Sequence, residues 1–568
     1  MVLELFPLLR GRLLFLLRHS PLTSRVATAR LLSSDTYNLR EQRRPVSTDQ
    51  QSSQQQKKQT CFICGGNCKC GGACGHIRSN FKYYASAAAL LIASGIVLGP
   101  FENDKIPEEI PYLLIGAGTA SYHAALTIRA RDADAKVLIV GDERHLPYNR
   151  PNLTKELWWY GDENVIYFDI VSSNLEYKSL TGRTKEVYYE TKGFYVSPAQ
   201  ISSAEHGGVS LLTGHRIVKL DIPAHTAYLE DGRKIKYEKC LIATGKSNSR
   251  LSPSTIPLFD NAAPEVKKKM SLFHTVDDFK KVYDIAKNAK SITVVGGNIL
   301  ASELAYSLNR KFGEKGLKVN QVFKQKGIVG EILPEYLSKM ATDRLRDNGV
   351  NIVTGETPVK ATLNKNKEVE LDFASGGMLY VLSYLEKLAS DYVIVISDVK
   401  PNTEIAEASS LEVDKVKGGF LVDAELRART DVWVAGAACS YYDVRLGRRR
   451  ADLWDDAQVT GRLAGENMTG GQKHYWHQAA YQSTIAPGIY FQGVGRTEPS
   501  LPTVSVFASD DGKATDRGVV FYLHNKTVVG IVLFNVFGYG VDVARHVIAD
   551  GKEHDEKDLK EVSRGSYF

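Results

Sequence analysis

Cysteine, methionine and tryptophan are scarce in this chain of 568 residues, which contains seven, five and five of them. Five of the cysteines crowd into Cys61–Cys74, so only Cys240 and Cys439 remain for the rest of the chain. That number excludes a disulfide scaffold at this length. Neither of the two belongs to a CxxC pair, which argues against dithiol chemistry and favours small buried side chains.

Excess positive charge is missing from most of the chain. The net charge of +7 comes from the first hundred residues, and residues 101–568 carry a net charge of −2. A globally basic nucleic-acid-binding body is therefore excluded, and any such contact must be a local patch. With 43% hydrophobic and 24% charged residues, the chain can bury several cores, which excludes a disordered protein and predicts two to four domains.

The first hundred residues are typical of a targeting segment followed by an anchor. Five arginines and one acid interrupt the Leu/Phe runs of residues 1–34, which predicts a mitochondrial presequence over 1–46, with a membrane-surface helix or a signal peptide as alternatives. Residues 47–80 form a linker with the Cys/Gly cluster. The cluster offers soft ligands for zinc but matches no zinc module by spacing, so we assign no metal to it. Metal binding, lipidation, a redox role or no role stay open.

Residues 82–99 predict a short transmembrane anchor, because the chain is apolar from Tyr83 to Leu98. The bases before this segment would place its N-terminal side in the matrix and the body outside the inner membrane. A helix packed on the body is the alternative interpretation.

A strand, a Gly-rich turn and a helix open the body at residue 112. Gly116 allows the tight turn, and Gly118 lets a pyrophosphate approach the helix N-terminus. The next strand, at 136–140, is followed by Asp142 and Glu143, and an acid at this place can bind ribose hydroxyls. This order of parts predicts a dinucleotide-binding unit.

A second unit of the same kind begins near residue 290, but its fingerprint is altered. Asn298 stands where the second glycine is expected, and the strand at 318–323 ends in Lys324, Gln325 and Lys326 without a carboxylate. Loss of the acid removes the usual partner of the NAD ribose, and the lysines would favour the 2′-phosphate of NADP. The alternative is a domain that keeps the fold and binds nucleotide poorly.

Long stretches of the body resemble one family in order. They include LLIGAGTA, LPYNRPNLTKELW (146–158), ILPEYLS (332–338), YWHQ (475–478) and GVVFYLHNKTVVGIVLFNVF (518–537). Over nearly all of 110–560 the chain resembles the two-dinucleotide-binding-domain flavoproteins and, within them, the apoptosis-inducing factor family. The resemblance implies an α/β fold with two Rossmann-like domains and a C-terminal α+β domain. The implied limits are 109–246 and 398–471 for FAD, 247–397 for NAD and 472–568 for the C-terminal domain.

The resemblance also implies the site residues. Lys155 and Glu303 would be the catalytic ion pair beside the flavin, where a lysine can stabilise the charge that arrives on reduction. The FAD contacts would be Gly116, Ala117, Gly118, Thr119, Ala120, Asp142, Glu143, Arg150, Lys155, Ile217 and His274. Contacts at the ring and on the nicotinamide side would fall on Ala437, Leu453, Trp454, Gly297, Ile299, Gln325 and Gln482, and most of these differ from the family pattern.

Two hypotheses about function follow. The first is an FAD-dependent oxidoreductase that takes a hydride from NADH or NADPH in the intermembrane space, supports respiratory chain assembly and dimerises on reduction. The second is a catalytically impaired flavoprotein that binds mitochondrial import or assembly partners. In both, the family implies a cell-death role in which the released protein reaches the cytosol and nucleus and contacts DNA through Arg448, Arg449 and Arg450. A solvated loop is the alternative for these arginines.

Overall fold

The computed structural model describes residues 105–160, 175–179, 182–247, 257–373, 387–396, 399–508 and 517–564. These residues belong to one compact unit, Leu98–Phe568. The expected presequence, Cys/Gly linker and anchor lie outside the described residues, as does most of the apolar stretch 378–388. Among the residues that the structure does describe, no helix is long and apolar enough to cross a membrane.

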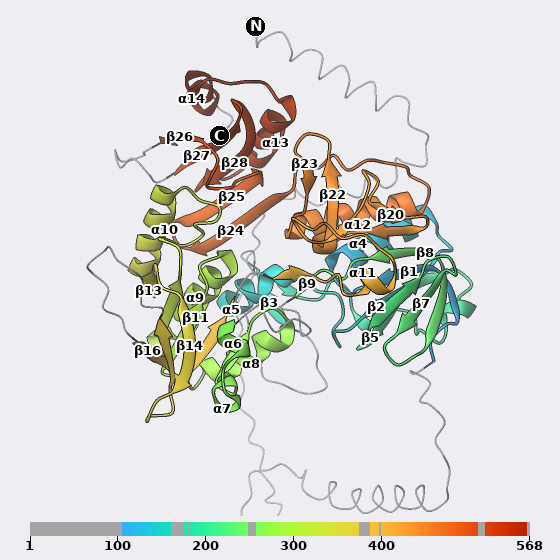
Figure 1. Ribbon diagram of the computed structural model, residues 1–568, viewed down its shortest axis with the longest axis horizontal. Helices are drawn as coiled ribbons and strands as arrows, with labels where there is room; N and C mark the ends of the chain where they lie inside the picture. The colour runs from blue at the N-terminus through green and yellow to red at the C-terminus, as the bar shows by residue number, and fades with distance from the viewer. Residues whose placement is uncertain are drawn as a thin grey trace, which may run out of the picture. The chain divides into compact units, whose positions relative to one another are not determined.

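An eight-stranded mixed sheet carries the first glycine turn (Figure 1). Its middle strands run parallel in the order β21-β8-β1-β2-β5, and β20, β6 and β7 pair antiparallel at the side. Such strands are covered on both faces, which explains the continuous apolar run at the end of β1. The strands are β1 (Glu109–Ile115), β2 (Lys136–Gly141), β5 (Gly208–Thr213), β6 (Ile217–Asp221), β7 (Thr226–Leu229), β8 (Lys234–Ile242), β20 (Arg427–Arg429) and β21 (Val432–Val434).

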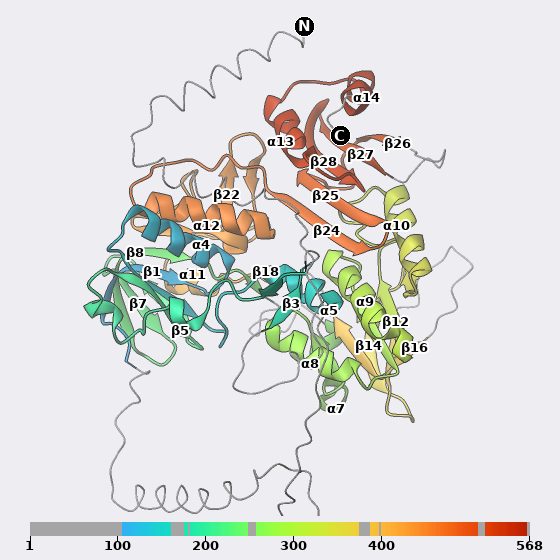
Figure 2. The same cartoon turned by 180° about the vertical axis from the view of Figure 1, so that it is seen from behind.

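Two helices from distant parts of the sequence lie side by side in this half of the unit. They are α4 (Thr119–Arg131) and α12 (Trp454–Met468), and both views of the ribbon show them together (Figures 1 and 2). Helix α12 therefore brings residues after 450 to the end of the sheet where the glycine turn lies.

A second, five-stranded parallel sheet follows the order β10-β17-β11-β12-β13. Its strands are β10 (Met270–Leu272), β11 (Ser291–Val295), β12 (Lys318–Phe323), β13 (Asn351–Thr354) and β17 (Tyr392–Val395). Its helices are α6 (Pro257–Asp260), α7 (Pro264–Lys267), α8 (Val276–Ala286), α9 (Ile299–Phe312) and α10 (Glu335–Asp347). An antiparallel sheet adjoins it, made of β14 (Pro358–Leu363), β15 (Val369–Phe373) and β16 (Lys387–Ser390).

A third, antiparallel sheet of five strands ends the chain, in the order β24-β25-β28-β27-β26. The strands are β24 (Ala480–Ala486), β25 (Ile489–Gly495), β26 (Thr503–Ala508), β27 (Arg517–His524) and β28 (Thr527–Phe534), followed by α13 (Gly540–Asp550) and α14 (Glu556–Arg564). The three sheets, the first of them mixed, give the α/β fold that the resemblance implied.

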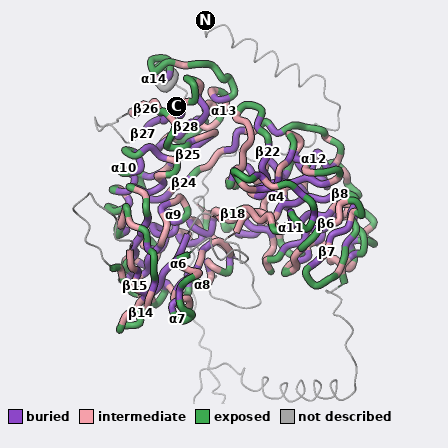
Figure 3. Tube along the Cα trace, in the orientation of Figure 1, coloured by how far each residue is buried: buried purple, intermediate pink, exposed green. Residues whose placement is uncertain are grey.

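Short elements connect the sheets. They are α5 (Glu156–Tyr160), α11 (Ile405–Ala408), the pairs β3 (Glu176–Lys178) with β4 (Thr184–Glu186) and β9 (Lys246–Ser247) with β18 (Lys400–Pro401), and the sheet of β19 (Phe420–Leu421), β22 (Cys439–Asp443) and β23 (Gly447–Arg449). The 3-10 turns nearest the cleft are η3 (Arg150–Leu153) and η8 (Gly436–Ala438). Figure 3 shows buried residues running along the strands of all three large sheets. Cys240 and Cys439 lie in this interior as free, fully buried thiols.

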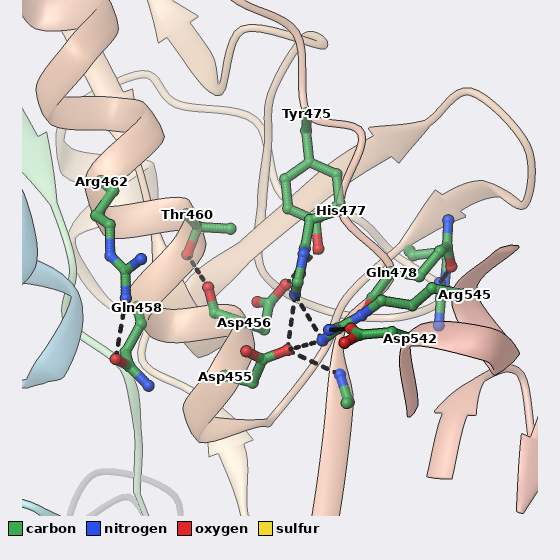
Figure 4. Close-up of polar contacts among 12 residues, drawn as sticks. Asp455, Asp456, Gln458, Thr460, Arg462, Tyr475, His477, Gln478, Asp542 and Arg545 are labelled. Carbon is green, nitrogen blue, oxygen red and sulfur yellow. Dashed lines mark hydrogen bonds and ion pairs between the residues drawn. The ribbon is translucent and has the colours of Figure 1, made fainter. Parts of the chain in front are cut away.

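The first turn of α12 carries two carboxyl groups with opposite surroundings (Figure 4). Asp455 Oδ2 accepts hydrogen bonds from His477 Nε2 at 2.7 Å, Arg545 Nη2 at 3.2 Å and the backbone N–H of Ala480 at 2.9 Å. Burial alone would raise the pKa of Asp455, but these partners outweigh it and lower that pKa. Asp456 has no exposed surface, and burial raises its pKa to about 7 although Tyr475 Oη donates to it at 2.8 Å.

We expect Asp456→Asn to remove a pH-dependent loss of stability. The folded chain holds the Asp456 proton more tightly than the unfolded chain, so wild-type stability should fall as pH rises from 3.8 to about 7. The amide still accepts the Tyr475 hydrogen bond but does not titrate. In thermal unfolding, the advantage of the variant should grow up to about pH 7 and level off above it. Asp284→Asn, at an exposed position of α8, is the control. A pH-independent difference for Asp456→Asn would contradict the assignment.

Candidate functional site

The first glycine turn leaves a helix N-terminus open. Gly116 has φ +104°, and a Cβ there would lie 2.2 Å from the carbonyl oxygen of Ala243, so only glycine fits. A Cβ on Gly118 would meet nothing within 4 Å. Gly118 is also the N-cap of α4, which has no side-chain cap and no acid in its first turn. These unsatisfied N–H groups suit an anionic ligand such as a pyrophosphate.

The two acids after β2 are used differently. Glu143 forms an ion pair with Arg150 and accepts a hydrogen bond from Tyr148 Oη at 2.8 Å. Burial alone would raise the pKa of Glu143, but the Arg150 charge and these hydrogen bonds lower it. Asp142 is exposed and lines the cleft, and its side chain makes no hydrogen bond to another described residue. Asp142 is therefore the acid that is free to accept from a ribose.

Arg150 connects this region to His274. Its Nη1 donates to the His274 carbonyl oxygen at 2.9 Å. Burial and the charges of Arg150 and Lys246 lower the pKa of His274 to about 3, so its imidazole is neutral at neutral pH. A neutral imidazole can accept a hydrogen bond in the cleft without adding charge.

Lys155 and Glu303 meet inside the cleft. Lys155 Nζ lies 2.7 Å from Glu303 Oε1, and Glu303 has no exposed side-chain surface. Thr154 Oγ1 donates to Glu303 Oε2 at 2.5 Å, and Ser483 Oγ donates to Oε1 at 2.6 Å. The carboxylate thus receives three hydrogen bonds, from the η3–α5 connection and from β24, while it stands on α9.

Thr154 and Ser483 are site residues that the sequence did not reveal. Thr154 is next to Lys155 in the stretch 146–158 that carries the resemblance, and this position could have marked it as a site residue. Ser483 is 180 residues from Glu303, and nothing in the sequence links the two. Nothing in the sequence links Tyr189 to Thr119 or Trp454 either. The Tyr189 hydroxyl lies 3.0 Å from Thr119 Oγ1 and accepts from Trp454 Nε1 at 2.8 Å.

Residues after 430 complete the lining of the cleft. Ala437, Leu453, Trp454 and Gln482 all line it, and Trp454 is 41% exposed. The Gly436 N–H donates to Thr460 Oγ1 at 2.9 Å, which fixes the η8 turn against α12. Ile217 does not line the cleft, because its side chain is 3% exposed in the core of the first sheet.

The second glycine turn differs from the first. Asn298 is the N-cap of α9, and its side chain accepts from the Ala301 N–H at 3.0 Å. The side chain thus turns back onto the helix and satisfies one of its free N–H groups. Asn298 and Ile299 line the cleft, whereas Gly297 and Gln325 do not. Gln325 Oε1 lies instead 3.0 Å from the position of a Cβ on Gly297.

The arginines expected to form a basic patch are largely engaged within the fold. Arg448 Nη1 donates to the carbonyl oxygens of Val422 and Ser440, at 2.6 and 2.8 Å. Arg449, with a side chain 13% exposed, pairs with Asp443, and Arg450 pairs with Asp452. Arg448, Arg449 and Arg450 therefore do not form the exposed patch that the sequence suggested, because burial and ion pairing use their charges.

The residues that line the cleft enclose a volume of about 2120 Å³. It contains the first glycine turn, the Lys155–Glu303 pair and the start of α9. A cleft of this size exceeds the ~300–1,000 Å³ of a common small-molecule pocket and has room for more than one nucleotide-sized ligand.

Comparisons with known proteins agree with this arrangement. Residues 111–461 match the pyridine nucleotide-disulphide oxidoreductase family, and residues 464–517 and 509–550 match the C-terminal region of mitochondrion-associated apoptosis-inducing factor. A ferredoxin reductase structure from Rhodopseudomonas palustris has a TM-score of 0.61 at 21% identity, covering 81% of this chain and 98% of its own. The fold and cleft therefore define an FAD-dependent NAD(P)H oxidoreductase of the pyridine nucleotide-disulphide class.

Two relatives narrow the class. A Drosophila melanogaster relative assigned to apoptosis-inducing factor 1, mitochondrial, is 34% identical over 519 residues, which span 83% of this chain and 67% of the relative. Apoptosis-inducing factor 1, mitochondrial, of Dictyostelium discoideum is 34% identical over 470 residues, spanning 81% of this chain and 82% of the relative. The chain belongs to the apoptosis-inducing factor family.

The residues present fit the FAD that this family uses. The uncapped N-terminus of α4 and the open side of Gly118 leave donors and space for a pyrophosphate. Asp142 supplies a carboxylate for ribose hydroxyls at the end of the neighbouring strand β2.

A pair of glycine substitutions should separate folding from FAD binding. Gly116→Ala would push a Cβ into the Ala243 carbonyl, so we expect a lower unfolding temperature and loss of FAD. Gly118→Ala meets no protein atom and should fold normally, but its methyl group enters the space for the pyrophosphate and should weaken FAD binding. Unfolding temperature and flavin absorbance measure the two effects. Equal FAD content in wild type and Gly118→Ala would contradict the placement.

Proposed function

We propose that this protein is a mitochondrial flavoenzyme that oxidises NADH or NADPH beside the Lys155–Glu303 pair. The observation that carries the proposal is the fully buried Glu303 carboxylate, which holds Lys155 Nζ at 2.7 Å inside the cleft that fits FAD. FAD, when bound, supplies the ring that takes a hydride from the reduced nicotinamide. The residues of the chain supply a positive charge, on Lys155, and hold it in position.

Lys155 would bring a positive charge to the reacting region. A fixed cation stabilises negative charge that develops in a site from which water is excluded. Its side chain is 14% exposed, which limits screening by solvent. Glu303, held by Thr154 and Ser483, fixes the position of the ammonium group and offsets the cost of burying it. Lys155 therefore has a catalytic role in the proposal, and Glu303 positions it.

The wider setting follows from the relatives. Both apoptosis-inducing factor relatives are named as mitochondrial, which supports a mitochondrial location. In the proposal the oxidoreductase unit faces the intermembrane space, where reduction changes its association with itself and with assembly partners. Release to the nucleus, DNA contact and cell death are implications of the family to which no described surface adds support. A flavoprotein that binds partners without turnover is the alternative.

Anaerobic reduction by NADH or NADPH tests the proposal. We expect the flavin bands of the wild type to bleach. Glu303→Gln keeps one acceptor oxygen for Thr154 or Ser483, and the other hydroxyl must then accept from the amide NH2. The variant loses the charge that fixes Lys155 and should slow bleaching about 10- to 100-fold with unchanged FAD content. Lys155→Met would leave Glu303 buried without its cation, so Lys155→Met/Glu303→Gln is the better test of the lysine and should be slowest.

The matched control is Lys287→Met. Lys287 pairs with Asp284 on α8 and does not line the cleft, so its loss should leave reduction unchanged. Bound flavin that stays oxidised in the wild type would refute the enzyme and leave the scaffold. Reduction at the wild-type rate in both cleft variants would refute the roles of Lys155 and Glu303.

A further inference from the structure

The second dinucleotide unit lacks an acid at the end of its second strand, yet a carboxylate reaches the cleft from nearby. Strand β12 ends at Phe323, and Lys324, Gln325 and Lys326 follow it. None of these three lines the cleft, whereas Glu331, six residues beyond Gln325, does. Lys326 Nζ is paired with Glu335 at 2.9 Å.

Gln325 links the strand end to that carboxylate. Its Nε2 donates to Glu331 Oε1 at 2.7 Å. Its Oε1 lies beside the glycine turn, 3.0 Å from where a Cβ on Gly297 would stand. Gln325, at the position where the acid is usually found, therefore spans from the glycine turn to Glu331. Its amide orients the Glu331 carboxylate.

The loop that carries Glu331 is held firmly. The Val329 N–H donates to the Gly297 carbonyl oxygen at 2.7 Å, and Ile328 is bonded on both sides, to Thr342 Oγ1 at 2.8 Å and from Ser338 Oγ at 2.7 Å. Past Glu331, Tyr522 Oη donates to the Ile332 carbonyl oxygen at 2.6 Å. Glu331 is thus tied to the glycine turn from its N-terminal side and to β27 from its C-terminal side.

Val329 adopts a strained backbone conformation in this loop. Its φ is +54°, a left-handed conformation that β-branched residues rarely adopt. Such outliers persist where the surrounding structure enforces them, and they cluster at ligand sites. Here the enforced conformation places Val329 and Glu331 on the cleft beside Asn298 at the start of α9.

We propose that Glu331 is the carboxylate that accepts the adenosine ribose hydroxyls of the dinucleotide at the second site, and that it makes the protein select NADH over NADPH. A carboxylate accepts from the free 2′- and 3′-hydroxyls, but it repels a 2′-phosphate. The bases at the strand end, which favoured NADP in the sequence, do not line the cleft. The inference rests on the proposed binding of NAD(P)H and adds its specificity.

Calorimetric binding to the FAD-loaded protein tests this selection. The probes are ADP-ribose and its 2′-phosphate, which contain the adenosine half and cannot transfer a hydride. The wild type should bind ADP-ribose at least about 10-fold more tightly. Glu331→Gln should weaken ADP-ribose about 10- to 100-fold and abolish the preference. Glu331→Arg should reverse the preference.

Two further variants control for general effects. Glu335→Gln removes a nearby carboxylate that does not line the cleft and should change neither affinity. Gln325→Glu in the Glu331→Gln background returns an acid to the strand end and should restore the preference for ADP-ribose.

The outcomes separate this inference from the proposed function. Selective binding that Glu331→Gln abolishes supports the inference even if NADH fails to bleach the flavin. Equal binding of the two probes by the wild type, or an unchanged preference in both Glu331→Gln and Glu331→Arg, overturns the inference even if NADH bleaches the flavin normally.

Discussion

A carboxylate with no exposed surface must be neutralised where it lies, and in this protein that requirement falls on Glu303. Its partners come from the η3–α5 connection, which follows β2 of the first sheet, and from β24 of the third sheet, while Glu303 itself stands on α9 of the second. Removing one partner of a buried ion pair typically costs about 3–5 kcal/mol. The buried charge of Glu303 therefore requires that these elements of the three sheets meet at the cleft.

Much of the architecture could be predicted from local sequence. The apolar strands and the glycines at 116 and 118 predicted the first dinucleotide unit, because a tight turn and a parallel strand buried on both faces have direct sequence requirements. Asn298 shows where local interpretation stopped. The sequence showed only a missing glycine at this position, whereas in the structure the Asn298 side chain caps α9.

Contacts between distant segments could not be predicted in the same way. Ser483 reaches the cleft from β24 of the third sheet, and Tyr189 contacts Thr119 and Trp454, which line it. Neither belongs to a recognisable motif. The consecutive arginines at 448–450 suggested a basic surface patch when only the sequence was considered. In the structure, β23 pairs with β22, and the guanidinium groups of Arg448 and Arg449 bond to carbonyls and to the buried Asp443 carboxylate, while Arg450 pairs with Asp452.

Helices α4 and α9, which follow the two glycine turns, differ in how the N–H groups at their N-termini are satisfied. Helix α4 begins without a side-chain cap, so its first N–H groups gain partners only when an anion arrives, and the stability of that end depends on the bound group. Helix α9 begins with its own cap, because Asn298 accepts from one of the first N–H groups when nothing is bound. Loss of a bound anion should therefore loosen the start of α4 more than the start of α9.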